Sequence, residues 1–111
     1  MKKILVLVLS LMLCACNNAS DSENIKTVME EKDYIIIDVR TKEEYLESHI
    51  SEAINIPYNE ITEDIDIDKN TVVFVYCRSG SRSEVAFNIL ADLGYEVYDL
   101  GAFSEIDLPK E

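Results

Sequence analysis

An apolar run meets a polar, cysteine-bearing loop in the stretch Thr71-Val72-Val73-Phe74-Val75-Tyr76-Cys77-Arg78-Ser79-Gly80-Ser81-Arg82. The run Thr71–Tyr76 is typical of a buried strand, and an amphipathic helix is expected to begin near Ser81. Cys77 therefore ends a strand just before a helix N-terminus, where loop N–H groups and the helix dipole favour negative charge. Arg78 and Arg82 add positive charge. All of these influences favour the thiolate of Cys77, which is the reactive form of a cysteine.

The segments on either side of this stretch predict alternating strands and helices. Further strands are expected at Tyr34–Val39, Ala53–Ile56 and Glu96–Leu100. Helices are expected at Glu23–Glu31, at Thr41–Ser48 with a capping box, and after the loop, where one face carries Val85, Ala86, Ile89, Leu90 and Leu93 and Gly94 ends the helix. This alternation predicts an α/β fold with a parallel sheet, whose ligands bind at the carboxyl ends of the strands.

The segment Tyr58–Asn70 between the second and third strands is acidic and irregular, with one helical turn expected near Glu60–Ile65. Its carboxylates match no calcium-loop pattern, because such a loop needs a central glycine. We therefore expect this segment to be a solvated surface, and we expect no metal site in the protein.

The first residues have the pattern of an export signal. Lys2 and Lys3 precede the apolar run Ile4–Leu13, which is shorter than the ~20 residues of a membrane-spanning helix. Leu13-Cys14-Ala15-Cys16 resembles the lipobox of bacterial lipoproteins, which implies removal of residues 1–15 and lipid attachment at Cys16. Residues 16–22 would then form a polar tether and residues 23–111 the folded domain, exported and anchored on the extracytoplasmic face of a bacterial membrane. An uncleaved anchor or an ordinary signal peptide is the alternative.

Cleavage at this point has consequences for cysteine chemistry and charge. Cys77 would be the only free thiol of the processed protein, so that no intramolecular disulfide could form. Loss of Lys2 and Lys3 would change the formal charge from −12 to −14 over the 96 remaining residues. That length predicts a single domain, and the acidity argues against nucleic acid as a partner.

Several short motifs, in order, resemble a single-domain rhodanese. They are Asp38-Val39-Arg40, Glu44-Tyr45, His49-Ile50, Ala53-Ile54-Asn55-Ile56-Pro57, Cys77-Arg78-Ser79-Gly80-Ser81-Arg82-Ser83 and Leu93-Gly94-Tyr95 with Val97-Tyr98-Asp99-Leu100-Gly101. The resemblance implies a three-layer α/β domain in which helices flank a short parallel sheet. It also implies thiosulfate:cyanide sulfurtransferase chemistry through a persulfide on Cys77.

The resemblance assigns the substrate-binding role to the loop residues Arg78, Ser79, Gly80, Ser81 and Arg82. Their main-chain N–H groups would hold the thiolate, the donor anion and the persulfide in turn, as an oxyanion hole does. Arg82 is expected to pair an oxyanion of the donor, and Arg78 to point outward. The expected partners are a small thiosulfate-like sulfur donor and a thiol or cyanide acceptor. If the protein acts as a carrier, a partner protein that receives the persulfide is also expected. No cofactor is implied, and we expect a monomer.

Three residues outside the loop are expected to support the structure. Asp38 and Arg40 end a strand and are expected to form a buried ion pair or hydrogen-bonded brace. His49 is the only histidine, and we assign it a structural role rather than that of a general base.

The chain departs from the family pattern at two places. Glu52 stands where the family commonly has glycine, so the turn there needs another geometry or some backbone strain. Gly101-Ala102-Phe103 replaces a Gly-Gly-aromatic segment, the chain has no tryptophan, and it stops soon afterwards at Glu111. These departures concern donor preference and stability rather than the persulfide.

Two other classes of function remain open on the sequence alone. A phosphatase or arsenate reductase of the same fold would need five residues between cysteine and arginine, whereas four residues, Arg78–Ser81, separate Cys77 from Arg82. A lipid-anchored carrier that holds persulfide with little turnover would need the same cysteine, so only measurement separates it from an enzyme.

Overall fold

A computed structural model describes residues 21–111, with side chains from Asn24 onward. The predicted signal peptide and Cys16 lie outside the described residues, so those predictions stay untested by the structure. The chain divides into two units, Met1–Lys32 and Asp33–Glu111, which we describe separately. In the first unit, helix α2 spans Asp21–Glu31 and so begins within the expected tether. No helix within residues 21–111 has both the length and the apolar character that a membrane span requires.

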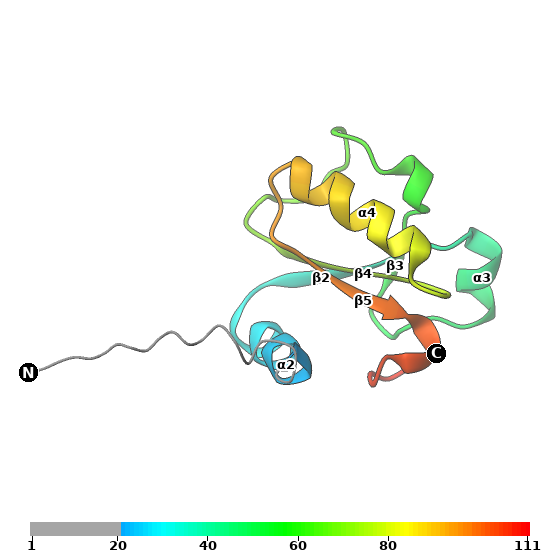
Figure 1. The fold of residues 1–111 in the computed structure, drawn as a ribbon. Helices are drawn as coiled ribbons and strands as arrows, with labels where there is room; N and C mark the ends of the chain where they lie inside the picture. The colour runs from blue at the N-terminus through cyan, green and yellow to red at the C-terminus, as the bar shows by residue number, and fades with distance from the viewer. Residues whose placement is uncertain (1–20) are drawn as a thin grey trace, which may run out of the picture. The chain divides into compact units, whose positions relative to one another are not determined.

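The second unit is built on a four-stranded sheet in which every pair of neighbours is parallel. The strand order is β3-β2-β4-β5. The bounds are Tyr34–Asp38 for β2, Ile54–Asn55 for β3, Val72–Cys77 for β4 and Val97–Ala102 for β5. The predicted α/β class with a short parallel sheet is confirmed (Figure 1).

Strand β4 is central in the sheet and its six residues, V-V-F-V-Y-C, are all buried. Its β-branched and aromatic side chains suit a strand that is covered on both faces. The pairing aligns Asp38 of β2 with Tyr76 of β4, and Cys77 with Ala102 of β5 after a register shift between Val75 and Tyr76. The carboxyl ends of β2, β4 and β5 therefore lie side by side around Cys77.

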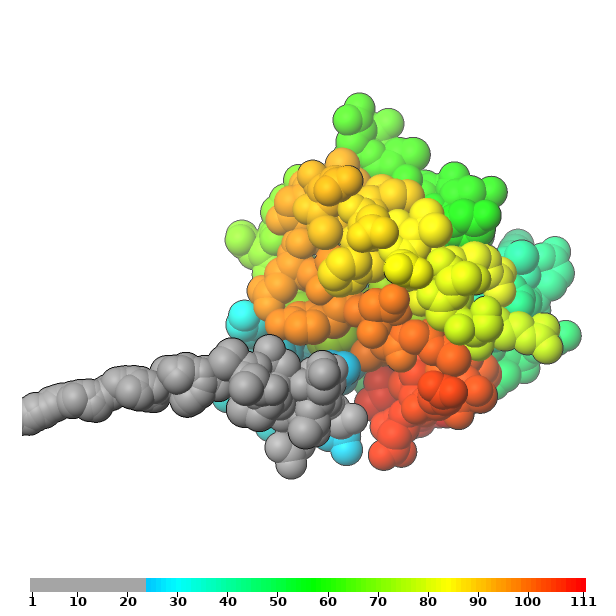
Figure 2. Space-filling view, in the orientation of Figure 1, coloured from blue at the N-terminus to red at the C-terminus, as the bar shows by residue number. Residues whose placement is uncertain are grey.

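Helix α4, Ser81–Asp92, lies across one face of this sheet and hides much of it in the space-filling view (Figures 1 and 2). Its buried residues are Ser83, Ala86 and Leu90. The core beneath it contains Ile37, Val39, Ile61, Val73, Val75, Cys77 and Tyr95. Gly94 has φ +102°, as expected for the glycine that ends a helix.

Val85 lies on the apolar face expected for α4 but is 44% exposed. An α-helix turns by about 100° per residue, which places Val85 to one side of the narrow stripe formed by Ser83, Ala86 and Leu90. Ile89 and Leu93 are only partly buried at the margin of that stripe.

The remaining elements are short. Helix α3 spans Lys42–Glu47, and its capping box is present as predicted, with Thr41 at the N-cap and Glu44 reaching back to it. Single turns of 3₁₀ helix, η3 and η4, occupy Tyr58–Glu60 and Phe103–Glu105. The helical turn expected near Glu60–Ile65 therefore begins earlier, at Tyr58.

The last residues of the chain pair with the segment after α3. An antiparallel bridge joins Ile50 to Lys110, and His49 exchanges two main-chain hydrogen bonds with Glu111, at 2.9 and 2.7 Å. A third bond joins Ser51 N–H to the carbonyl of Pro109 at 2.8 Å. These bonds fix residues 49–51, of which Ile50 donates its N–H to Tyr76 Oη near the carboxyl end of β4.

Candidate active site

Cys77 is fully buried at the end of β4, and its sulfur receives the N–H of Gly80 at 2.9 Å. Gly80 has φ +105°, a conformation that glycine adopts without steric cost and that turns its N–H back toward the sulfur. No side chain caps the N-terminus of α4. The sulfur therefore lies where helix N–H groups still need an acceptor.

Ser83 is the second partner of the sulfur, and the sequence analysis did not assign it a role. Its Oγ lies 3.5 Å from Cys77 Sγ and donates to the carbonyl of Gly80 at 3.1 Å. The side chain is completely buried in the first turn of α4. When the thiol ionises, rotation of the hydroxyl can bring its hydrogen to the thiolate.

Two opposing effects set the acidity of Cys77. Burial raises the pKa of the thiol, whereas hydrogen bonds from the Ser83 hydroxyl and from the N–H groups of Ser83, Gly80 and Ser79 lower it. The lowering effects prevail, so the pKa of Cys77 lies below its ordinary value. A buried thiolate held by fixed donors is a competent nucleophile.

Arg82 has a partner within the protein. Its guanidinium forms two hydrogen bonds to the Glu44 carboxylate of α3, at 2.8 and 3.2 Å, and its pairing with a donor oxyanion stays a prediction. This pairing, together with bonds from Thr41, holds the pKa of Glu44 at about 2, well below its usual 4.5. Arg82 thus joins the catalytic loop to α3, which its place in the motif did not indicate.

Asp38 and Arg40 form the ion pair that their position predicted. Arg40 Nη2 lies 2.6 Å from Asp38 Oδ2, and both side chains are nearly inaccessible to solvent. Asp38 also accepts a hydrogen bond from Tyr76 Oη at 2.7 Å, and Tyr76 in turn accepts the N–H of Ile50 at 3.0 Å. The ion pair therefore braces the strand residue next to Cys77.

His49 packs against Tyr45 of α3. Its ring stacks on Tyr45 with centroids 3.9 Å apart, and Nδ1 lies 2.9 Å from the Tyr45 carbonyl oxygen. Together with the main-chain bonds to Glu111, these contacts suit a structural residue. Among the described residues, no three His, Cys, Asp or Glu side chains are grouped so that they could hold a metal ion.

The two departures from the family pattern have visible structural consequences. Glu52 has φ +77°, the strained conformation expected at this turn, and accepts a hydrogen bond from Tyr34 Oη at 3.0 Å. Phe103 stacks on Tyr76 at 5.7 Å between ring centroids and lies 4.5 Å from the Arg40 guanidinium carbon. The aromatic ring of Gly101-Ala102-Phe103 thus closes one side of the site.

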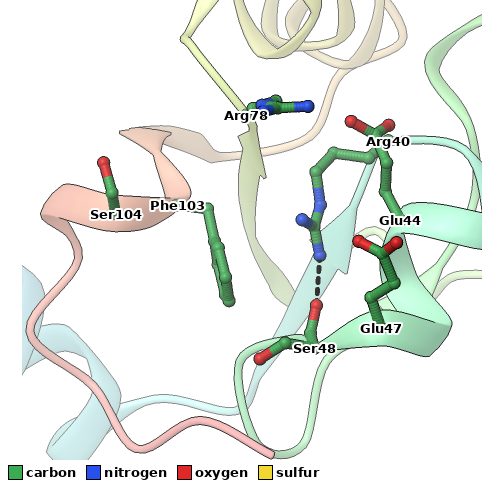
Figure 3. Close-up of a pocket in the computed structure, with 7 residues that line it drawn as sticks. All are labelled: Arg40, Glu44, Glu47, Ser48, Arg78, Phe103 and Ser104. Atoms are coloured by element: carbon green, nitrogen blue, oxygen red, sulfur yellow. Dashed lines mark hydrogen bonds between the residues drawn. The ribbon is translucent and has the colours of Figure 1, made fainter.

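A pocket of about 450 Å³ lies beside the catalytic loop, that is, residues 78–82 after Cys77 (Figure 3). Arg78 is exposed, as expected, and at the same time forms part of the pocket wall. Arg40 is at its centre in the view, with Phe103 on one side and residues of α3 on the other. The lining residues are Arg40, Glu44, Glu47, Ser48, Arg78, Phe103 and Ser104.

Comparison with known families gives the same assignment as this geometry. Residues 21–106 match the rhodanese-like domain. The chain belongs to the rhodanese-like family. The match includes the sheet, the Cys77 loop and α4, so the resemblance seen in the sequence motifs is confirmed for the whole fold.

Individual rhodanese-like relatives support the assignment. The chain is 44% identical over 78 residues to the thiosulfate sulfurtransferase PspE of Escherichia coli strain K12, covering 67% of this chain and 75% of that protein. It is 34% identical over 80 residues to a sulfurtransferase of Allochromatium vinosum, covering 70% of this chain and 75% of the relative. A solved structure described as a rhodanese with anions from E. coli superposes with a TM-score of 0.65 at 38% identity, covering 70% of this chain and 96% of that one.

Proposed function

We propose that this protein is a thiosulfate-type sulfurtransferase that carries sulfane sulfur as a persulfide on Cys77. The observation that carries the proposal is the buried sulfur at the end of β4 with Gly80 N–H at 2.9 Å and Ser83 Oγ at 3.5 Å. The relatives named as sulfurtransferases support it. The expected partners are a small anionic sulfur donor and a thiol acceptor.

The donor half-reaction uses the groups already placed around the sulfur. The Cys77 thiolate attacks the outer sulfur of thiosulfate, a new S–S bond forms, and sulfite leaves with the electron pair of the broken bond. The product, Cys77–S–S⁻, is again an anion. The same fixed N–H donors can therefore stabilise the reactant and the product without reorganising.

Intact mass spectrometry tests the proposal directly. Incubation with thiosulfate should add the mass of one sulfur atom, removable by cyanide or dithiothreitol, and Cys77→Ser should abolish the addition. An unchanged mass at saturating thiosulfate would overturn the proposal. Turnover with an acceptor then separates an enzyme from a persulfide carrier, because a carrier gains the sulfur but cycles slowly.

We further propose that the protein is exported and anchored by lipid at Cys16, with its domain outside the cytoplasm, and that the domain is a monomer. Support for export and anchoring comes from the Lys2-Lys3 and Ile4–Leu13 pattern and from Leu13-Cys14-Ala15-Cys16. Stable anchoring needs more than one acyl chain, because each buried CH₂ contributes only ~0.8 kcal/mol. Cys16→Ser should release the protein from membranes or leave it unprocessed; normal processing with full membrane retention would refute lipidation.

A further inference from the structure

Two of the four charged side chains that line the pocket, Arg40 and Glu44, are compensated by ion pairs. Arg40 is neutralised by Asp38 at 2.6 Å, and Glu44 by Arg82 at 2.8 Å. Both pairs are at least partly buried, so neither charge is readily available to a ligand. The paired residues shape the pocket without giving it a net charge.

Two of the lining residues differ from this pattern. Arg78 and Glu47 are exposed, and neither side chain has a hydrogen bond or ion pair with another residue in the part of the chain that the structure describes. They come from different elements, Arg78 from the catalytic loop after β4 and Glu47 from the last position of α3. Figure 3 shows them on opposite sides of Arg40. The pocket therefore offers one uncompensated positive group and, separately, one uncompensated negative group.

The third wall of the pocket is apolar. The Phe103 ring stacks on Tyr76 at 5.7 Å between centroids, and Arg40 Cζ and Lys110 Nζ lie 4.5 and 5.3 Å from its centroid. A ring fixed in this way provides a surface for the carbon atoms of a small ligand. The volume of about 450 Å³ is large enough for an amino acid or a short peptide.

We propose that this pocket selects a small zwitterionic thiol as the sulfur acceptor, that is, an α-amino-acid or short-peptide thiol with a free ammonium and a free carboxylate. The inference rests on the proposed function. Arg78 binds the carboxylate, for which a guanidinium is well shaped, and Glu47 binds the ammonium. A thiol with only one of these charges leaves the opposite residue without a partner.

The acceptor half-reaction is balanced without any further reagent. The acceptor thiol transfers its proton to the outer sulfur of Cys77–S–S⁻, and the acceptor thiolate so formed attacks that sulfur of Cys77–S–SH. The S–S bond of the persulfide breaks, its electron pair stays on Cys77 Sγ, and a new S–S bond joins the sulfane sulfur to the acceptor. The products are the acceptor persulfide, which keeps the proton, and the Cys77 thiolate.

Four thiols that differ only in charged groups test this assignment: cysteine, 3-mercaptopropionate, cysteamine and 2-mercaptoethanol. The full-length protein is first loaded with sulfur from thiosulfate, and the second-order rate of persulfide loss is measured for each thiol. Each rate is divided by the rate of the same thiol with a small neutral disulfide at the same pH, which corrects both for the thiolate fraction and for the intrinsic nucleophilicity of the acceptor. Cysteine should react about three- to tenfold faster than either singly charged thiol. This is the range expected when one additional ion pair forms at a site that is exposed or partly desolvated.

Two variants assign the charges. Glu47→Gln should remove the preference for cysteine over 3-mercaptopropionate and leave its preference over cysteamine. Arg78→Gln should do the reverse. The crossed pattern serves as an internal control, since a general loss of reactivity would lower all four rates together. Glu84→Gln, which makes the same charge change at an exposed position of α4 outside the pocket, should leave both ratios unchanged.

The result can overturn the inference without affecting the proposed function. If the persulfide forms but the wild-type protein shows no preference for cysteine, or if either ratio is insensitive to its variant, the pocket does not recognise a zwitterion. If no persulfide forms at all, the mass measurement has already refuted the sulfurtransferase proposal on which the inference rests.

Discussion

Replacing Ser83 by alanine removes the side-chain hydroxyl that lies 3.5 Å from Cys77 Sγ and is completely buried. A hydrogen bond to a charged group contributes roughly 1.5–3 kcal/mol, but the hydroxyl must give up its bond to the Gly80 carbonyl, which contributes about 1 kcal/mol. The net loss of thiolate stabilisation is then about 0.5–2 kcal/mol, and since one pKa unit is 1.36 kcal/mol, the middle of this range corresponds to a rise of about one unit in the pKa of Cys77.

This shift has a distinctive kinetic consequence. Thiolate nucleophilicity rises with thiol pKa, with a Brønsted coefficient of about 0.4–0.5, so a rise of one unit makes each thiolate about threefold more reactive. At pH values below both pKa values the thiolate fraction falls about tenfold, and the observed rate should therefore fall only about threefold. Above both pKa values, Ser83→Ala should react about threefold faster than the wild type. The two pH profiles should cross.

The rate of reaction with a neutral pyridyl disulfide, measured across the pH range, provides the assay. Ser81→Ala is the matched control, because it removes an exposed hydroxyl at the start of the same helix and leaves the main-chain donors in place. Its midpoint should not move. An unchanged midpoint in Ser83→Ala would falsify the assignment of Ser83 as a donor to the thiolate, and a uniform fall in rate at every pH would indicate a collapsed loop instead.

Two further predictions concern stability, measured by urea denaturation. Glu44 has its pKa lowered to about 2 in the folded protein, so the stability it contributes through Arg82 is present above its usual 4.5 and is lost as pH falls from there toward 2. The stability difference between the wild type and Glu44→Gln should be constant near neutral pH and shrink over that acid range; a difference that does not depend on pH contradicts the ion pair. Glu52→Gly should be more stable than Glu52→Ala by about 1 kcal/mol, because both lose the hydrogen bond from Tyr34 but only alanine retains the left-handed strain at φ +77°. Equal stability of the two variants would show that this turn is unstrained.

Features that depend on neighbouring residues could be predicted from the sequence. The apolar run before Cys77 is the buried central strand, and the Thr41–Glu44 pattern is a capping box, because each is determined within a few residues. Glu52 has a positive φ, so of the two outcomes expected where the family commonly has glycine the turn shows backbone strain. In each of these cases the residue types within a few positions determine the local conformation.

Other features depend on contacts between distant parts of the chain. Arg82 pairs with Glu44, 38 positions away, and no local pattern indicates this partner. The contact of Ser83 with Cys77 depends on the angle at which α4 leaves the loop. Val85 is exposed because the sheet contacts a stripe of the helix that is narrower than its apolar face.

The position of Cys77 on the most deeply buried strand determines how sulfur must move through this protein. Cys77 Sγ, which carries the transferred sulfur, belongs to a central strand with a neighbouring strand on each side. It therefore cannot move between two separate binding sites, as a group on a flexible segment can. Donor and acceptor must instead visit the same opening one after the other. Donor and acceptor therefore compete for the site. Excess acceptor occupies the protein before Cys77 carries sulfur and delays the donor, and excess donor occupies the persulfide form and delays the acceptor. Sulfur flow should be fastest at an intermediate ratio of the two, so the supply of both compounds outside the protein governs its output.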